Sequence, residues 1–223
     1  MPRRLRPTAA TAAAAVLVGD PGRALLLAQE LLEQPKMSNH ARGLWGYYGN
    51  TPGGVPLTIQ STGMGGPSAV LVLDDLAELG VRRAVRVGTC IGLEAGGSPG
   101  DLLLVGEAIA AGESANSLGV RAGTALTPDR ELTDGLAAAL GDDCHPATVA
   151  SVDAHPLTPA AVAGAAAADM QTAPLLARAA ALEVGLAVLL IVSEHQRQDD
   201  LTREDLEELE KRAGRAAGLV LSS

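Results

Sequence analysis

The sequence predicts a single-domain α/β fold with a central mixed sheet flanked by helices. Apolar runs of strand length alternate with longer amphipathic stretches, and this alternation is typical of a sheet covered by helices. Gly-rich segments accompany three of the apolar runs, at Gly19–Arg23, Ser61–Ser68 and Arg86–Gly92. A chain of 223 residues is long enough to bury one full core. We therefore expect residues 1–223 to form one domain, and we allow for flexibility in residues 1–11.

Several apolar runs have the length and composition of β-strands. The run Ala14–Val18 ends directly at a Gly-Asp-Pro-Gly turn, and Ala84–Val87 leads into the third Gly-rich segment. Because ligands on α/β sheets bind at the carboxyl ends of the strands, we expect the Gly-rich turns to meet at such ends. In chain order the predicted strands are Ala14–Val18, Leu57–Ser61, Ala84–Val87, Leu102–Glu107, Thr148–Val152, Ala165–Met170 and Ala187–Val192.

The amphipathic stretches between these runs predict helices. Leu73, Leu76 and Leu79 lie on one face of the second stretch, and Gly80 ends it. The last stretch begins with Thr202-x-x-Asp205, an approximate capping box, and keeps helical spacing of its apolar residues to the end. In chain order the predicted helices are Ala24–Glu33, Ser68–Leu79, Asp129–Leu140, Ala173–Glu183 and Thr202–Leu221.

The charge and cysteine content exclude several classes of function. The net charge of −9 and the pI near 4.9 disfavour a nucleic-acid surface, which needs a basic face. Cys90 and Cys144 do not make a disulfide framework, so we expect a reducing, cytoplasmic setting. The four histidines are scattered and no Cys/His pair has ligand spacing, so no metal site is expected. No run reaches the roughly 18 apolar residues that cross a bilayer, so no membrane partner is expected.

The N-terminal segment has two interpretations. Arg3, Arg4 and Arg6 precede an Ala-rich stretch, and this pattern imitates a signal peptide. The apolar run instead leads straight into Gly19–Arg23, so we interpret it as the first strand. Backbone N–H groups at such a turn, with an arginine behind them, form a cradle for an anion. Gly-Asp-Pro-Gly is also ordinary turn chemistry, and the two further Gly-rich segments favour the anion site.

Six motifs occur in an order that resembles a known enzyme family. The set resembles the nucleoside phosphorylases, in particular the hexameric bacterial purine nucleoside phosphorylases and the uridine phosphorylases, and it spans nearly the whole chain from about Val16. The motifs are Gly19-Asp20-Pro21-x-Arg23, Asn39-His40-x-Arg42-Gly43-Leu44-Trp45-Gly46-Tyr47, Ser61-Thr62-Gly63-Met64-Gly65-Gly66-Pro67-Ser68-Ala69, Arg86-Val87-Gly88-Thr89-Cys90, Asp169-Met170-Gln171-Thr172-Ala173 and Val192-Ser193-Glu194.

The resemblance implies a phosphate pocket and an assembly. Phosphorolysis exchanges the base of a nucleoside for phosphate, so inorganic phosphate is the co-substrate and no other cofactor is expected. By the resemblance, Arg42 reaches the phosphate of a neighbouring subunit in a homo-oligomer, which we expect to be a hexamer; a surface salt bridge is the alternative role for Arg42. Arg86 interrupts an apolar strand, where an unpaired charge would be costly. The phosphate residues implied are Gly19, Arg23, Arg42, Arg86 and Thr89.

The resemblance also implies sites for the sugar and the base. Glu194 would be the general acid that protonates the leaving base, and Arg86 would share the catalytic role by holding phosphate. Met170 would pack under the ribose, although a core methionine is an equal alternative. The ribose residues implied are Met64, Met170 and Gln171. The base residues implied are Cys90, Gly92, His155, Asp169, Ser193 and Glu194.

Several positions depart from the family pattern. Gln171 stands where the family has a glutamate that grips the ribose hydroxyls, and an amide cannot neutralise a cation-like sugar. Glu194 stands where the family has an aspartate. Ile91 is inserted in the phosphate loop, and the segment Asp153–Pro156 offers His155 in place of the usual aromatic residues, since the chain has no Phe. A solvated loop histidine is the alternative role for His155.

Three functions fit these residues. The first is a purine nucleoside phosphorylase, favoured because the chain lacks the Gln and Arg with which pyrimidine-specific relatives read uracil. The second is a uridine phosphorylase. The third is a diverged protein that binds nucleoside or phosphate with weak or no turnover, for which Gln171 and the missing aromatic residues argue. A hydrolytic nucleosidase is disfavoured because the chain keeps the arginines of a phosphate pocket.

Overall fold

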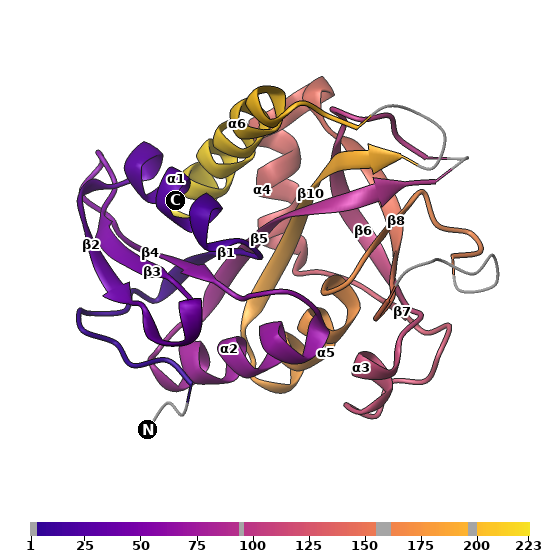
Figure 1. Cartoon of the computed structure of the whole chain (residues 1–223), viewed down its shortest axis with the longest axis horizontal. Helices are drawn as coiled ribbons and strands as arrows, with labels where there is room; N and C mark the ends of the chain where they lie inside the picture. The colour runs from indigo at the N-terminus through magenta and orange to yellow at the C-terminus, as the bar shows by residue number, and fades with distance from the viewer. Residues whose placement is uncertain (1–3, 94–95, 155–161, 196–199) are drawn as a thin grey trace.

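The central element of the structure is one ten-stranded mixed sheet (Figure 1). The structure is a computed structural model, and it describes residues 4–93, 96–154, 162–195 and 200–223. Within these residues the strands are β1 (Ala14–Val18), β2 (Glu33–Asn39), β3 (Gly46–Asn50), β4 (Pro56–Ser61), β5 (Arg83–Gly92), β6 (Leu102–Ala110), β7 (Ala125–Leu126), β8 (His145–Ser151), β9 (Ala167–Asp169) and β10 (Gly185–His195). The predicted fold class, an α/β domain with a central mixed sheet, is confirmed.

Part of the sheet closes on itself. Strand β10 pairs in parallel with β5 and antiparallel with β6, and the path β6–β8–β9–β5 joins those two partners, so five strands form a ring. From β5 the sheet continues outward through β1, β4, β3 and β2. Strands β1, β4, β5 and β10 all run parallel to one another through their shared pairings. Their carboxyl ends therefore lie at the same edge, which is where ligands bind on such sheets.

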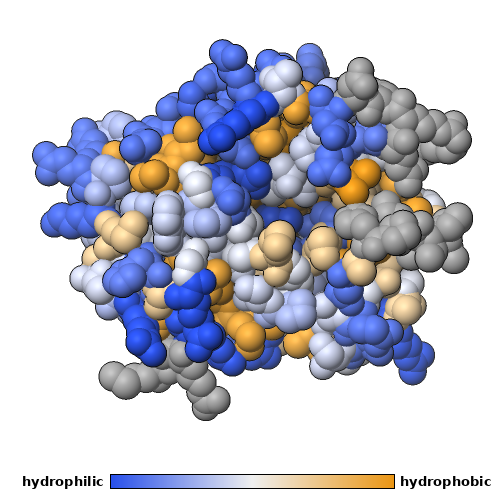
Figure 2. Space-filling view, in the orientation of Figure 1, coloured by the Kyte–Doolittle hydropathy of each residue, from blue (hydrophilic) through white to orange (hydrophobic). Residues whose placement is uncertain are grey.

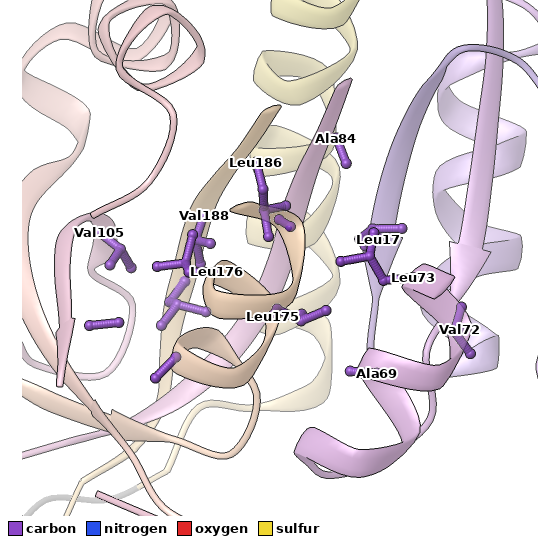
Figure 3. Close-up of a cluster of buried hydrophobic side chains, with 14 of the residues drawn as sticks. Leu17, Ala69, Val72, Leu73, Ala84, Val105, Leu175, Leu176, Leu186 and Val188 are labelled. Atoms are coloured by element: carbon purple, nitrogen blue, oxygen red, sulfur yellow. The ribbon is translucent and has the colours of Figure 1, made fainter. Parts of the chain in front are cut away.

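Two layers of helices cover the sheet. One layer holds α2 (Gly66–Glu78), α3 (Glu113–Asn116) and α5 (Thr172–Ala181); the other holds α1 (Pro21–Leu31), α4 (Arg130–Leu140) and α6 (Arg203–Leu221) (Figure 1). Two short 3-10 turns lie at Ala41–Gly43 and Gly141–Asp143. In the first layer, Leu73 of α2 and Leu175 of α5 pack toward Leu17 and Leu186 of the strands (Figure 3). All four side chains are at most 2% exposed, so this layer is a closed apolar core.

The helix boundaries follow from their caps. The expected helix Ala24–Glu33 is wrong at both ends, because the Asp20 carboxylate accepts a hydrogen bond from the Arg23 backbone N–H (2.8 Å) and starts α1 at Pro21. Leu32 is already extended, and Glu33 belongs to β2. The cap of α6 is confirmed: the Asp205 backbone N–H donates to the Thr202 hydroxyl (3.2 Å).

The sequence reasoning missed β2, β3, β7 and α3. Strand β2 is the outermost strand of the sheet and has mostly exposed residues, so it lacks the apolar pattern of a buried strand. The segment Arg86–Gly92 was expected as a turn and is instead the second half of β5. It stays extended because its residues pair with β10 as far as Gly92. The expected strand Ala165–Met170 is shorter, at Ala167–Asp169, and the other predicted strands are present within a few residues of their expected bounds.

The first described residues lie against α2. The Asp75 carboxylate accepts hydrogen bonds from the backbone N–H groups of Arg4 (2.6 Å) and Leu5 (2.8 Å), and the Leu5 side chain is buried. In Figure 2, hydrophilic residues cover much of the visible face, and hydrophobic residues lie in separate patches between them. Within the described residues, the helices are all too short or too polar to cross a bilayer.

Candidate functional site

A cavity of about 670 Å³ lies where the carboxyl ends of β1, β4, β5, β9 and β10 meet. The start of α1 and the segment between β4 and α2 complete its wall. Residues that are far apart in the sequence converge there because the four parallel strands end at one edge. Most of the predicted site residues line this cavity: Gly19, Arg23, Met64, Arg86, Thr89, Cys90, Asp169, Met170, Gln171, Ser193 and Glu194.

Arg23 is held at the cavity by a buried acid. Its Nε donates to Glu210 Oε1 of α6 at 2.6 Å, and both side chains are 8% exposed. Within the described residues, its two Nη groups make no hydrogen bond, so they remain available to a ligand in the cavity. Sequence reasoning missed Glu210, because 187 positions separate it from Arg23 and it follows a run of other acids in the first turns of α6.

Arg86 is held by a second buried acid. Its Nη2 donates to Asp169 Oδ2 at 2.9 Å, and its buried Nε has no hydrogen-bond partner within the described residues. A side chain at position 88 would collide with the Arg86 guanidinium, which explains the glycine there. Asp169 also accepts from the hydroxyls of Ser151 (2.6 Å) and Thr172 (2.7 Å). These hydrogen bonds hold the Asp169 carboxylate in place, and that carboxylate in turn holds the Arg86 guanidinium. The role of Asp169 in base binding stays a prediction.

The charge of the cavity is not strongly positive. Arg23 and Arg86 are each paired with a buried carboxylate, and Asp20 and Glu194 also line the wall. An anion in the cavity therefore depends on the free hydrogens of the two guanidinium groups and on the Thr89 hydroxyl, since Pro21 has no N–H and the Arg23 N–H is bonded to the Asp20 carboxylate. Such a site selects its ligand by the geometry of the hydrogen bonds as much as by the charge of the ligand.

A Gly-rich segment between β4 and α2 forms the opposite edge of the cavity. Gly63 and Gly65 have φ of +71° and +79°, which favour glycine, and between them the Met64 side chain is 89% exposed. Gln171 is buried under this segment, and its amide Nε2 donates to the Gly63 carbonyl at 2.6 Å. The segment Gly63–Gly65 is thus bonded to a side chain from the β9–α5 junction.

The end of β10 carries the candidate acid. The pairing with β5 shifts between Val192 and Glu194, so Ser193 is an extra residue in a β-bulge. This bulge turns Ser193 and Glu194 toward the cavity, where the Glu194 side chain is exposed. Cys90 lies beside them, and burial, followed by the nearby Asp169 carboxylate, raises the pKa of its thiol. The thiol is therefore protonated at neutral pH and is not a nucleophile.

Three predicted residues lie elsewhere. Arg42 is exposed in the 3-10 turn Ala41–Gly43, with φ of +61°, and is not part of this cavity wall. Gly92 is buried at the end of β5 outside the wall. His155 falls outside the described residues. Within them, no group of three metal-ligating side chains comes together.

Parts of the chain are similar in sequence to known phosphorylases. The chain is 43% identical over 76 residues to a purine nucleoside phosphorylase DeoD-type of Oceanobacillus iheyensis, which is 34% of the chain and 32% of that protein. It is 40% identical over 90 residues to one of Clostridium perfringens, 40% of the chain and 38% of that protein. It is 34% identical over 95 residues to a uridine phosphorylase of Haemophilus influenzae, 43% of the chain and 37% of that protein.

The matched segments thus span between 32% and 38% of the length of these curated relatives. The match to the family as a whole is far longer. The sequence pattern of the phosphorylase superfamily covers residues 13–223, which include every described strand and helix. The chain belongs to the phosphorylase superfamily.

Proposed function

We propose that this protein is a purine nucleoside phosphorylase, which converts a purine ribonucleoside or 2′-deoxyribonucleoside and phosphate into the free base and the sugar 1-phosphate. The observation that carries the proposal is the convergence of Arg23, Arg86 and Glu194 on one cavity. Two arginines suit the phosphate, and an exposed carboxyl at the bulge suits the leaving base. The similarity to purine nucleoside phosphorylases over part of the chain supports the same choice.

The proposed reaction divides the cavity into three regions. Phosphate binds between Arg23, Arg86 and Thr89, with backbone N–H groups of the Gly19 turn as further donors. A phosphate oxygen forms a bond to the anomeric carbon of the sugar while the bond from that carbon to the base nitrogen breaks. The base leaves with the electron pair of that bond and receives a proton from Glu194. The cation-like sugar is stabilised in the transition state by the phosphate anion that faces it.

The sugar lies in this scheme between Met170 and the Gly63–Gly65 segment. Met170 and Met64 supply apolar contact on either side, and the missing side chains of the glycines allow a close approach. Ser193, Cys90 and Glu194 surround the base. As part of the same proposal, the protein is a homo-oligomer, with a hexamer expected, in which Arg42 serves the phosphate site of a neighbouring subunit; its exposure leaves it available for that contact.

A uridine phosphorylase is the second candidate, supported by the similarity to the Haemophilus influenzae uridine phosphorylase. A panel of inosine, adenosine, guanosine and uridine, assayed for base release with and without phosphate, separates the two. Phosphate-dependent release from the purine nucleosides supports the proposal, and release from uridine alone supports the second candidate. Binding of nucleoside without release from any of the four would identify a diverged binding protein.

A further inference from the structure

We infer that Gln171 is a positioning residue whose side-chain amide fixes the Gly63–Gly65 segment at the edge of the cavity. The effect of this role on catalysis rests on the proposed function. The positioning role replaces the simple expectation that Gln171 is a ribose ligand weakened by the loss of a charge.

The hydrogen bonds of the amide determine its orientation. Nε2 donates to the carbonyl oxygens of Gly63 (2.6 Å) and Gly65 (3.3 Å), and Oε1 accepts from the Thr62 hydroxyl (3.2 Å). A carbonyl oxygen needs a donor, so the nitrogen must face the two glycines. Both amide hydrogens are then used within the protein, and the side chain is 4% exposed. Little of it remains to bind the hydroxyls of a sugar.

The other anchors of the segment lie mainly at its two ends, where the Ser68 hydroxyl of α2 also donates to the Thr62 carbonyl (2.6 Å). Gly63 and Gly65 have left-handed φ, and the Met64 side chain between them is 89% exposed. On the strand side, the Thr62 backbone N–H donates to the Val18 carbonyl (2.7 Å), and on the helix side the Gly65 carbonyl accepts from the Ala69 N–H (3.3 Å). The Ser68 hydroxyl joins these two ends, and the Gln171 amide adds the hydrogen bonds to the Gly63 and Gly65 carbonyls between them.

A glutamate at position 171 cannot do the same. An ionised carboxylate has no hydrogen to donate, and it would face two carbonyl oxygens in a buried place. Only the protonated acid could donate, and then only once. The titratable and charged groups around this position are Asp169, which accepts from the Gln171 backbone N–H, its partner Arg86, and across the cavity Asp20, Arg23, Cys90 and Glu194. Burial and the two carbonyl oxygens that such a glutamate would face favour its protonated form.

The experiment compares Gln171→Glu and Gln171→Met with the parent protein and with Gln29→Glu, an exposed position on α1 that receives the same charge. Gln171→Met keeps the length of the side chain and buries no charge, so it carries the test if Gln171→Glu does not fold. The first readout is the ¹⁵N relaxation of the Gly63 and Gly65 amides. We expect the order parameters to fall from about 0.85 in the parent to about 0.6 or less in both variants. Gly53 and Gly54 in the β3–β4 turn should not change.

The second readout is steady-state kinetics. We expect the KM for nucleoside to rise about tenfold in both variants while the KM for phosphate changes less than twofold, because the segment borders the sugar and not the phosphate arginines. Lowering the pH should restore part of the parent KM for Gln171→Glu, as the carboxyl gains its proton, and none for Gln171→Met. Gln29→Glu should match the parent.

Unchanged order parameters together with a higher kcat for Gln171→Glu would overturn the inference, because a carboxylate would then act on the sugar directly. A parent protein without phosphate-dependent base release would contradict the proposed function instead. In that case the order parameters alone decide the role of Gln171.

Discussion

Two substitutions of Glu210, the buried partner of Arg23, should change phosphate binding in opposite directions. In Glu210→Ala, Arg23 keeps its charge and loses its buried partner, and removing one member of such a pair costs about 3–5 kcal/mol of unfolding free energy. Arg23 then loses the contact that aims it, so phosphate binding should weaken. In Glu210→Gln, the amide oxygen still accepts from Arg23 Nε, so the guanidinium stays in place while the opposing negative charge disappears.

The size of the second effect follows from Coulomb's law. A carboxylate and a phosphate on opposite sides of one guanidinium lie about 7 Å apart, and two unit charges at that distance interact by about 2.4 kcal/mol at an effective dielectric constant of about 20. The cavity is open to solvent, so we expect a smaller gain, about tenfold tighter phosphate binding, which is about 1.4 kcal/mol.

The assay is isothermal titration calorimetry with inorganic phosphate, accompanied by urea unfolding of each variant. Glu208→Gln is the matched control, because it removes the same charge from an exposed position of α6. The expected order of phosphate affinity is Glu210→Gln, then the parent and Glu208→Gln together, then Glu210→Ala. Equal affinities for all four proteins would refute the reasoning, because Arg23 would then have no contact with phosphate.

Further predictions concern the other groups of the site. Arg86→Ala should weaken phosphate binding by at least about 1.5–3 kcal/mol in calorimetry; unchanged binding would remove Arg86 from the pocket. Glu194→Gln should lower kcat for purine nucleosides by about 10²-fold in a base-release assay and leave phosphate affinity intact; an unchanged kcat would end its assignment as the acid. Mixing Arg42→Ala protomers with Arg86→Ala protomers should restore part of the activity, whereas an active monomer in light scattering would contradict a shared site. Cys90 should resist iodoacetamide at pH 8, because its raised pKa leaves almost no thiolate; rapid mass-spectrometric labelling would contradict this.

The strands were predictable where burial alone determines the pattern of apolar residues. The run Ala14–Val18 is apolar on both faces because helices cover both sides of β1, and its bounds were predicted correctly. Strand β2 was missed because its stability comes from pairing with β3, and its exposed residues carry no periodic pattern. The start of α1 was misplaced because Pro21 and the Asp20 cap were interpreted as turn residues only.

The sequence predicted most of the residues that line the site, but it did not predict which side chains contact one another there. Arg23, Arg86 and Glu194 stand in local motifs, so a resemblance could place them together. The partners Glu210 and Asp169 hold the arginines through contacts between distant segments, and no local pattern encodes which acid meets which arginine. The hydrogen bonds of Gln171 to Gly63 and Gly65 also cross from one strand end to another, so no local pattern predicted them, and its ribose role stays a prediction.

The most direct test of the proposed activity is base release from inosine by the full chain, followed with and without inorganic phosphate. The proposal predicts release of hypoxanthine that requires phosphate, saturates with it and produces ribose 1-phosphate in equal amount. Release that proceeds equally well without phosphate, with free ribose as the product, would contradict it.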